Sequence, residues 1–176
     1  MATEQEKTLA ALKTAIQMEI DGKQFYLKAS QTSGNELGRK LLEKLAEEED
    51  IHRQVFEGIY KQIEKDQGWP EKPFQPDGGR GLRTIFARAL DAMDMELQAL
   101  PSELEAVQKA MEMENKTYDF YNEHGKQAGF AAEKQFYQAL AMQEEEHHRV
   151  LLDYYEFLKD PAAWFVQKEH PSLDGG

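Results

Sequence analysis

Residues 45–52 read LAEEEDIH, and residues 140–151 read LAMQEEEHHRVL. Each stretch contains a Glu followed three places later by a His, and both pairs interrupt a run of apolar residues at helical spacing. The pairs are Glu49 with His52 and Glu144 with His147. Residues three apart in a helix differ by about 60° in direction, so one helix can present both side chains on the same face. The two stretches therefore predict two helices that each carry a carboxylate and an imidazole into an apolar core.

The chain repeats itself at an offset of 95 residues without a gap. The offset relates the two Glu-His pairs, and it also relates residues in the segments that precede them. Glu19, Tyr26, Gly34, Glu49, His52 and Tyr60 reappear as Glu114, Tyr121, Gly129, Glu144, His147 and Tyr155. Two unrelated amphipathic hairpins would share Leu and Ala, but they would not share Glu, His, Tyr and Gly in register. The sequence therefore predicts two copies of one helical hairpin.

Apolar residues at spacings of three, four and seven predict the individual helices. The predicted helices cover residues 3–31, 36–65, 82–100, 102–127 and 131–159. The density of Gly and Pro over residues 68–81 predicts a loop. Ser102 followed by Glu105 predicts a capping box at the start of the fourth of these helices. No helical period continues beyond Asp160, so we expect the end of the chain to lie along the bundle or fray.

These elements predict an all-α four-helix bundle made of two repeated hairpins and a long crossover that carries a short extra helix. A second helix of about 45 Å requires a connector that returns along its whole length. We expect one bundle domain over 1–160, with halves 5–65 and 100–160, a crossover over 66–101 and a C-terminal tail over 161–176.

Composition limits the classes of partner. The chain has 33 acidic and 21 basic residues and a formal charge of −12, which repels nucleic-acid phosphates and anionic lipids. The first twenty residues contain no continuous apolar stretch, so they predict neither a signal peptide nor a membrane span, and we expect a cytoplasmic protein. The sequence contains no Cys, which excludes disulfides and thiolate ligands, so any metal must bind to oxygen and nitrogen.

Helix rise brings the polar residues of each hairpin to one level. Glu19 lies about 22 Å before the turn at residues 33–34, and the Glu49-His52 pair lies about 25 Å after it. The repeat puts Glu114 at the level of the second pair. Four buried carboxylates repel one another and lose hydration, so we expect cations between them. Two divalent ions would balance the four charges, and oxygen ligands with one imidazole per ion suit iron or manganese.

A competing pair, Glu145 and His148, lies one position along the same helix. Neighbouring positions differ by about 100°, so the two pairs point in different directions. The repeat selects Glu144 and His147. Other residues in the acidic runs are interpreted as solvated helix surface.

Tyr26 and Tyr121 each follow a predicted ligand Glu by seven residues and share its helix face. Two interpretations stay open for them. They are ordinary core residues whose hydroxyls find a bond, or they support the metal site, for example by quenching radicals.

At these positions the chain resembles a known family. The phrases AIQMEIDGKQFY (15–26), LAEEEDIH, AMEMENKTYDFY (110–121) and LAMQEEEHHRVL resemble rubrerythrin-related proteins of the ferritin-like fold. The resemblance covers residues 5 to 160. It implies a di-iron site on the six Glu and His residues above, with Glu49 and Glu144 as bridging ligands and Glu19 and Glu114 as terminal ones; manganese or zinc could substitute for iron.

The resemblance also implies an oxidoreductase of the peroxidase or oxidase type, active in oxidative stress, whose iron pair is oxidised by hydrogen peroxide or oxygen. Rubrerythrins proper carry a Cys-ligated rubredoxin domain, and this chain has no Cys, so we expect electrons from a separate donor protein. Thr117 stands where such proteins offer a further carboxylate, which predicts a symmetric six-ligand site. We expect a homodimer.

Three alternatives stay open: ferritin-like iron oxidation and storage, a metal-stabilised bundle without catalysis, and a metal-free bundle with protonated glutamates.

Overall fold

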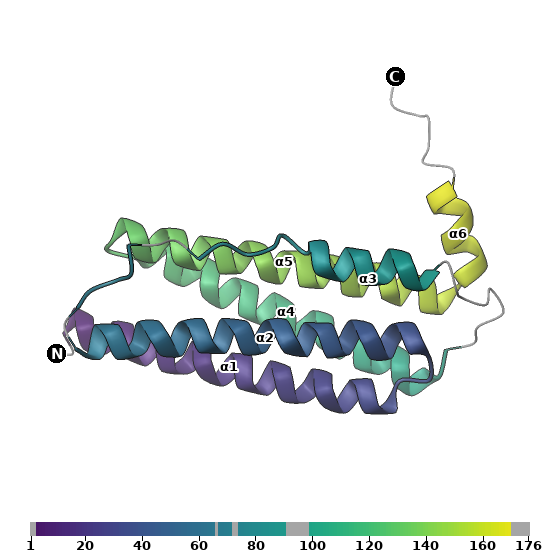
Figure 1. Ribbon diagram of the computed structural model, residues 1–176, viewed down its shortest axis with the longest axis horizontal. Helices are drawn as coiled ribbons and strands as arrows, with labels where there is room; N and C mark the ends of the chain where they lie inside the picture. Colours follow the sequence, from purple (N-terminus) through teal and green to yellow (C-terminus); the bar gives the residue numbers. More distant parts are fainter. Residues whose placement is uncertain (1–2, 66, 72–73, 91–98, 170–176) are drawn as a thin grey trace, which may run out of the picture.

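The computed structural model describes residues 3–65, 67–71, 74–90 and 99–169. Its described elements are helices: α1 (Glu4–Thr32), α2 (Glu36–Glu64), α3 (Arg80–Leu90), α4 (Pro101–Gln127), α5 (Ala131–Lys159) and α6 (Pro161–Glu169). Helix α1 packs against α2, α4 packs against α5, and α1 meets α4 (Figure 1). The chain therefore forms an all-α bundle of two helical hairpins, consistent with the ferritin-like architecture.

The turn of the first hairpin is built by short polar side chains and one glycine. Asn35 caps α2 by accepting a hydrogen bond from the backbone of Gly38 at 2.7 Å. A side chain at Gly38 would collide with the hydroxyls of Tyr154 and Ser33, so only glycine lets α5 approach α2 here. Buried Glu103 of α4 accepts hydrogen bonds from Ser33 and Tyr154. These contacts join the two hairpins at one end of the bundle.

The crossover runs back along the bundle and carries α3, which packs chiefly against α2 and also contacts α5 (Figure 1). Asp77 begins this helix by accepting hydrogen bonds from the backbone of Gly79 and Gly81. The extra helix was predicted over 82–100. It starts two residues earlier and is described to Leu90, and the rest of that prediction falls on 91–98, outside the described residues.

The predicted capping box at Ser102 and Glu105 is wrong. Helix α4 begins at Pro101 with Leu100 as its N-cap, and no side chain caps it. Proline is favoured in the first position of a helix because its φ is already helical and its missing N–H has no helical partner to lose. Ser102 therefore lies inside the first turn, where it cannot take the extended backbone of a cap residue.

The segment after Asp160, expected to lie along the bundle or fray, begins with a helix that no period in the sequence indicated. Helix α6 follows directly, because Asp160 accepts a hydrogen bond from the backbone of Ala163 and Pro161 occupies the first helical position. The Asp-Pro pair that ends α5 thus also starts α6. Trp164 is 7% exposed and packs against Phe86 and Phe157, which fastens α6 to α3 and α5.

Two apolar clusters fill the bundle and are separated by a polar layer. One cluster includes Leu12, Phe56, Tyr121, Tyr137 and Leu140. The other includes Tyr26, Leu45, Val107, Leu151 and Phe157. Each of the four long helices contributes to both clusters, and each changes from one to the other at its predicted metal ligands. The polar layer is therefore enclosed by apolar packing on both sides.

Candidate metal centre

The six predicted ligands lie together in this polar layer. Their side chains come from α1, α2, α4 and α5, and none is more than 4% exposed. The set comprises Glu19, Glu49, His52, Glu114, Glu144 and His147. Burial of this many ionisable groups is costly unless opposite charges accompany them.

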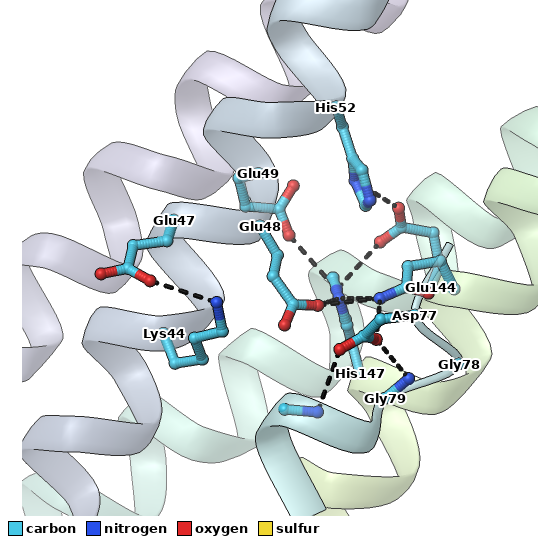
Figure 2. A network of polar contacts seen from close by, with 12 residues as sticks. Lys44, Glu47, Glu48, Glu49, His52, Asp77, Gly78, Gly79, Glu144 and His147 are labelled. Atoms are coloured by element: carbon cyan, nitrogen blue, oxygen red, sulfur yellow. Dashed lines mark hydrogen bonds and ion pairs between the residues drawn. The ribbon is translucent and has the colours of Figure 1, made fainter. Parts of the chain in front are cut away.

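His147 lies at the centre of the carboxylates. Its Nδ1 is 3.4 Å from Glu49 Oε1, 3.6 Å from Glu114 Oε2 and 3.5 Å from Glu144 Oε2. Figure 2 shows the ring between the side chains of Glu49 and Glu144, with dashed lines to both. Three helices thus direct oxygen atoms to one nitrogen.

His52 occupies the matching position in the first hairpin. Its Nδ1 is 3.3 Å from Glu19 Oε2 and 3.3 Å from Glu144 Oε1. The rings of His52 and His147 are nearly parallel, at 12°, with centroids 5.7 Å apart. The two oxygens of Glu144 therefore face the two imidazoles, one each.

The ligand atoms form two groups that could each hold a metal ion. Glu49, Glu114, Glu144 and His147 offer atoms that all lie within 4.8 Å of one another, and Glu19, Glu49 and His52 do the same. Glu49 is therefore shared between the two groups, and Glu144 lies between the two histidines.

Unpaired polar atoms show that the residues fit such ions. Among the described residues, several buried side-chain atoms have no hydrogen-bond partner, and most of them belong to the predicted ligands. They are Glu19 Oε2, His52 Nδ1, both Glu144 oxygens and His147 Nδ1. A buried polar atom without a partner costs free energy, and two cations would satisfy all of these atoms together.

Protons balance the charge of the carboxylates when metal is absent. Burial, followed by repulsion from Glu144, raises the pKa of Glu114 to about 8. Burial, followed by Glu19 and Glu144, raises the pKa of Glu49 well above its ordinary value. Burial opposes ionisation of Glu144 as well, but hydrogen bonds from His147, His52 and Glu114 together outweigh it and lower the pKa.

The same carboxylates raise the pKa of both imidazoles. Burial disfavours a charged ring at His52, but Glu19 and Glu144 outweigh it and raise the pKa to about 10. At His147 burial is again outweighed, chiefly by Glu114, and the pKa is raised well above its ordinary value. A metal ion must therefore displace protons when it binds.

Both predicted tyrosines contact the ligands, across the two hairpins. Tyr26 of α1 donates a hydrogen bond to Glu114 of α4, and Tyr121 of α4 donates one to Glu19 of α1. Both phenols are buried. Each hydroxyl therefore bonds to a predicted ligand, and a role of the tyrosines in the chemistry of the site stays a prediction.

Glu48 and Gln143 were missed by the sequence analysis, which interpreted Glu48 as solvated surface. Both are buried, at 6% and 2% exposure. Glu48 Oε2 lies 2.9 Å from Nε2 of His147 and accepts a hydrogen bond from Gln143 Nε2 at 2.8 Å. The offset of 95 relates these two positions, but one carries Glu and the other Gln, so the repeat contains no shared residue that would mark them.

The competing pair does not enter the site. The Glu145 side chain is 49% exposed and pairs with Arg149. His148 is half-buried and does not belong to either group of ligand atoms found in the described residues. Thr117 bonds to the backbone of Met113.

Comparison with known proteins identifies one family. The family model described as Rubrerythrin matches residues 10–155. No curated protein and no solved structure matches. Among the described residues, no helix is both long and apolar enough to cross a membrane.

Proposed function

Because the chain belongs to the rubrerythrin family, we propose that it is a di-iron oxidoreductase that reduces hydrogen peroxide or oxygen with electrons from a separate donor protein. The observation that carries this proposal is the polar layer, where four glutamates and two histidines converge around a shared Glu49. We propose that it acts as a homodimer.

The donor set supports iron. Glu19, Glu49 and His52 would hold one ion, and Glu49, Glu114, Glu144 and His147 the other. Hard carboxylate oxygens with one imidazole per ion suit iron or manganese, whereas structural zinc sites favour sulfur and fewer ligands. Two divalent ions also neutralise four carboxylates.

The iron pair, when bound, would supply the two electrons that cleave an O–O bond. Reduction of one peroxide also consumes two protons and yields two waters. Tyr26 and Tyr121 hold Glu114 and Glu19 in place, and they keep their phenolic protons because burial, followed by those carboxylates, raises the pKa of both. The two apolar clusters cover the layer from both ends of the bundle.

The test is metal analysis of protein purified without chelator, followed by stopped-flow mixing of the ferrous form with peroxide and, separately, with oxygen. We expect two irons per chain and a rapid rise of ferric absorbance with a defined stoichiometry. Native protein without metal, or ferrous protein that reacts with neither oxidant, would contradict the proposal. Uptake of many more irons than two, with a closed shell on a sizing column, would favour storage instead.

A further inference from the structure

The two histidines of the site are equivalent by the sequence repeat but not by their surroundings. Nε2 of His147, the nitrogen that points away from the carboxylate cluster, is 2.9 Å from Glu48 Oε2 (Figure 2). No ion pair joins Nε2 of His52 to a carboxylate in the described part of the chain. His52 instead packs edge-on against Phe74, with centroids 5.7 Å apart, and borders a cavity of about 300 Å³.

One of the positions at which the two halves of the repeat differ accounts for the missing carboxylate. The position that matches Glu48 in the second hairpin is Gln143. Gln143 donates to Glu48 at 2.8 Å, and its Nε2 also lies 3.5 Å from Asp77 of the crossover. The amide therefore reinforces the partner of His147, and it supplies no negative charge to His52.

The contact with Glu48 decides which nitrogen of His147 can bind metal. A carboxylate accepts hydrogen bonds and donates none, so the hydrogen between the two groups belongs to Nε2. A neutral ring with its hydrogen on Nε2 has a free lone pair on Nδ1. That atom faces Glu49, Glu114 and Glu144.

We propose that Glu48 is a positioning residue that orients His147 and makes its Nδ1 a stronger ligand, and that the two metal positions are consequently unequal. A carboxylate behind a ligating imidazole fixes the tautomer and raises the basicity of the ring, and loss of such a partner lowers metal affinity by about 10- to 100-fold. The position beside His147 is the tighter one. This inference rests on the two-metal site of the proposed function.

The repeat provides a matched pair of variants. Glu48→Gln keeps the shape of the side chain but removes its charge. The double variant E48Q/Q143E exchanges the two side chains, so the net charge and the Gln-Glu hydrogen bond are retained while the carboxylate moves to the position related to His52. Far-UV circular dichroism and thermal unfolding establish that each variant is folded.

Anaerobic ferrous titration against a competing chelator, with Mössbauer spectra of the loaded protein, gives the readout. We expect wild-type protein to bind two irons with unequal affinity and to show two ferrous quadrupole doublets of equal area. Glu48→Gln should weaken one iron by about 10- to 100-fold and shift one doublet only. The exchange variant should restore a tight position and two distinct doublets.

Two results would overturn the inference: a Glu48→Gln protein with wild-type affinities and spectrum, or an exchange variant that behaves like the single variant. If Glu48→Gln does not fold, zinc-loaded wild-type protein decides by nitrogen-15 NMR. A slowly exchanging Nε2–H at His147 alone supports the inference, and equal exchange at both rings refutes it. Wild-type protein that binds fewer than two irons would instead contradict the proposed function.

Discussion

Tyr26 of α1 donates a hydrogen bond to Glu114 of α4, so an aromatic residue of one hairpin holds a carboxylate of the other. Tyr121 holds Glu19 in the reverse direction. The bond from Tyr121 engages Oε1 of Glu19 and leaves Oε2 without a hydrogen-bond partner, beside His52. The reciprocal pair therefore ties the hairpins together at the level of the site and directs oxygens into it.

Replacement of either tyrosine by Phe should destabilise the protein. The change removes a hydroxyl that serves a buried carboxylate, which costs about 1–3 kcal/mol of unfolding free energy. Because the two residues are related by the repeat, Y26F and Y121F should have similar effects in urea titrations of metal-loaded protein. Tyr155→Phe is the control, since its hydroxyl bonds to Gln108 at the surface, and it should change stability by no more than about 0.5 kcal/mol. Core variants as stable as this control would show that the cross-hairpin bonds contribute nothing.

Metal-free protein should lose stability as pH rises. The folded-state pKa of Glu114 is raised from 4.5 to about 8, and that of His52 from 6.5 to about 10. A folded state that binds protons more tightly than the unfolded state is favoured at low pH, and its advantage disappears as pH rises through the folded pKa values. Unfolding free energy of chelator-treated protein should therefore fall from about pH 5 to pH 10.

Loaded protein should not show this fall, because cations replace the protons. The difference in unfolding free energy between loaded and metal-free protein should therefore increase with pH. Metal binding should also release protons, which calorimetry in buffers of different ionisation enthalpy measures. Parallel stability curves for loaded and metal-free protein would refute the assignment of the site.

The fold and the site were predictable to different depths. The repeat predicted the two-hairpin bundle. Helix rise then predicted that Glu19 and Glu114 lie at the level of the two Glu-His pairs, because it converts sequence distance into height. The repeat could not place Glu48. That residue sits in an acidic run typical of a solvated face. It is nevertheless buried beneath the crossover, so close to Gly81 that a Cβ added there would lie 3.7 Å from Glu48 Oε1. A loop sequence rich in Gly and Pro has no apolar period, so its path over the bundle could not be predicted.

Gly38→Ala should destabilise the turn end of the bundle without altering the site. The added methyl group would collide with the hydroxyls of Tyr154 and Ser33, and overpacking of this kind costs about 1–3 kcal/mol. Gly58→Ala is the matched control in the same helix. Nothing lies within 4 Å of its new methyl group, so it should stabilise the protein by up to about 1 kcal/mol. Thermal unfolding measures both effects, and two irons per chain in both variants would show that they are independent of the site. Equal effects of the two substitutions would contradict the close approach of α5 to Gly38.

Glu49→Gln should lower the iron content per chain more than the loss of a ligand that belongs to only one of the two groups. Glu49 contributes to both groups of ligand atoms, whereas Glu19 belongs to one. Removal of a shared carboxylate takes an oxygen from each ion and leaves the remaining charges unbalanced, so we expect less than one iron per chain in E49Q and about one in E19Q. Glu145→Gln tests the register of the Glu-His pairs, because its carboxylate is half-exposed and pairs with Arg149, and this variant should keep two irons. Inductively coupled plasma analysis after anaerobic loading and gel filtration measures all three. Loss of iron from E145Q with retention in E49Q would mean that helices α2 and α5 present a different face to the metal.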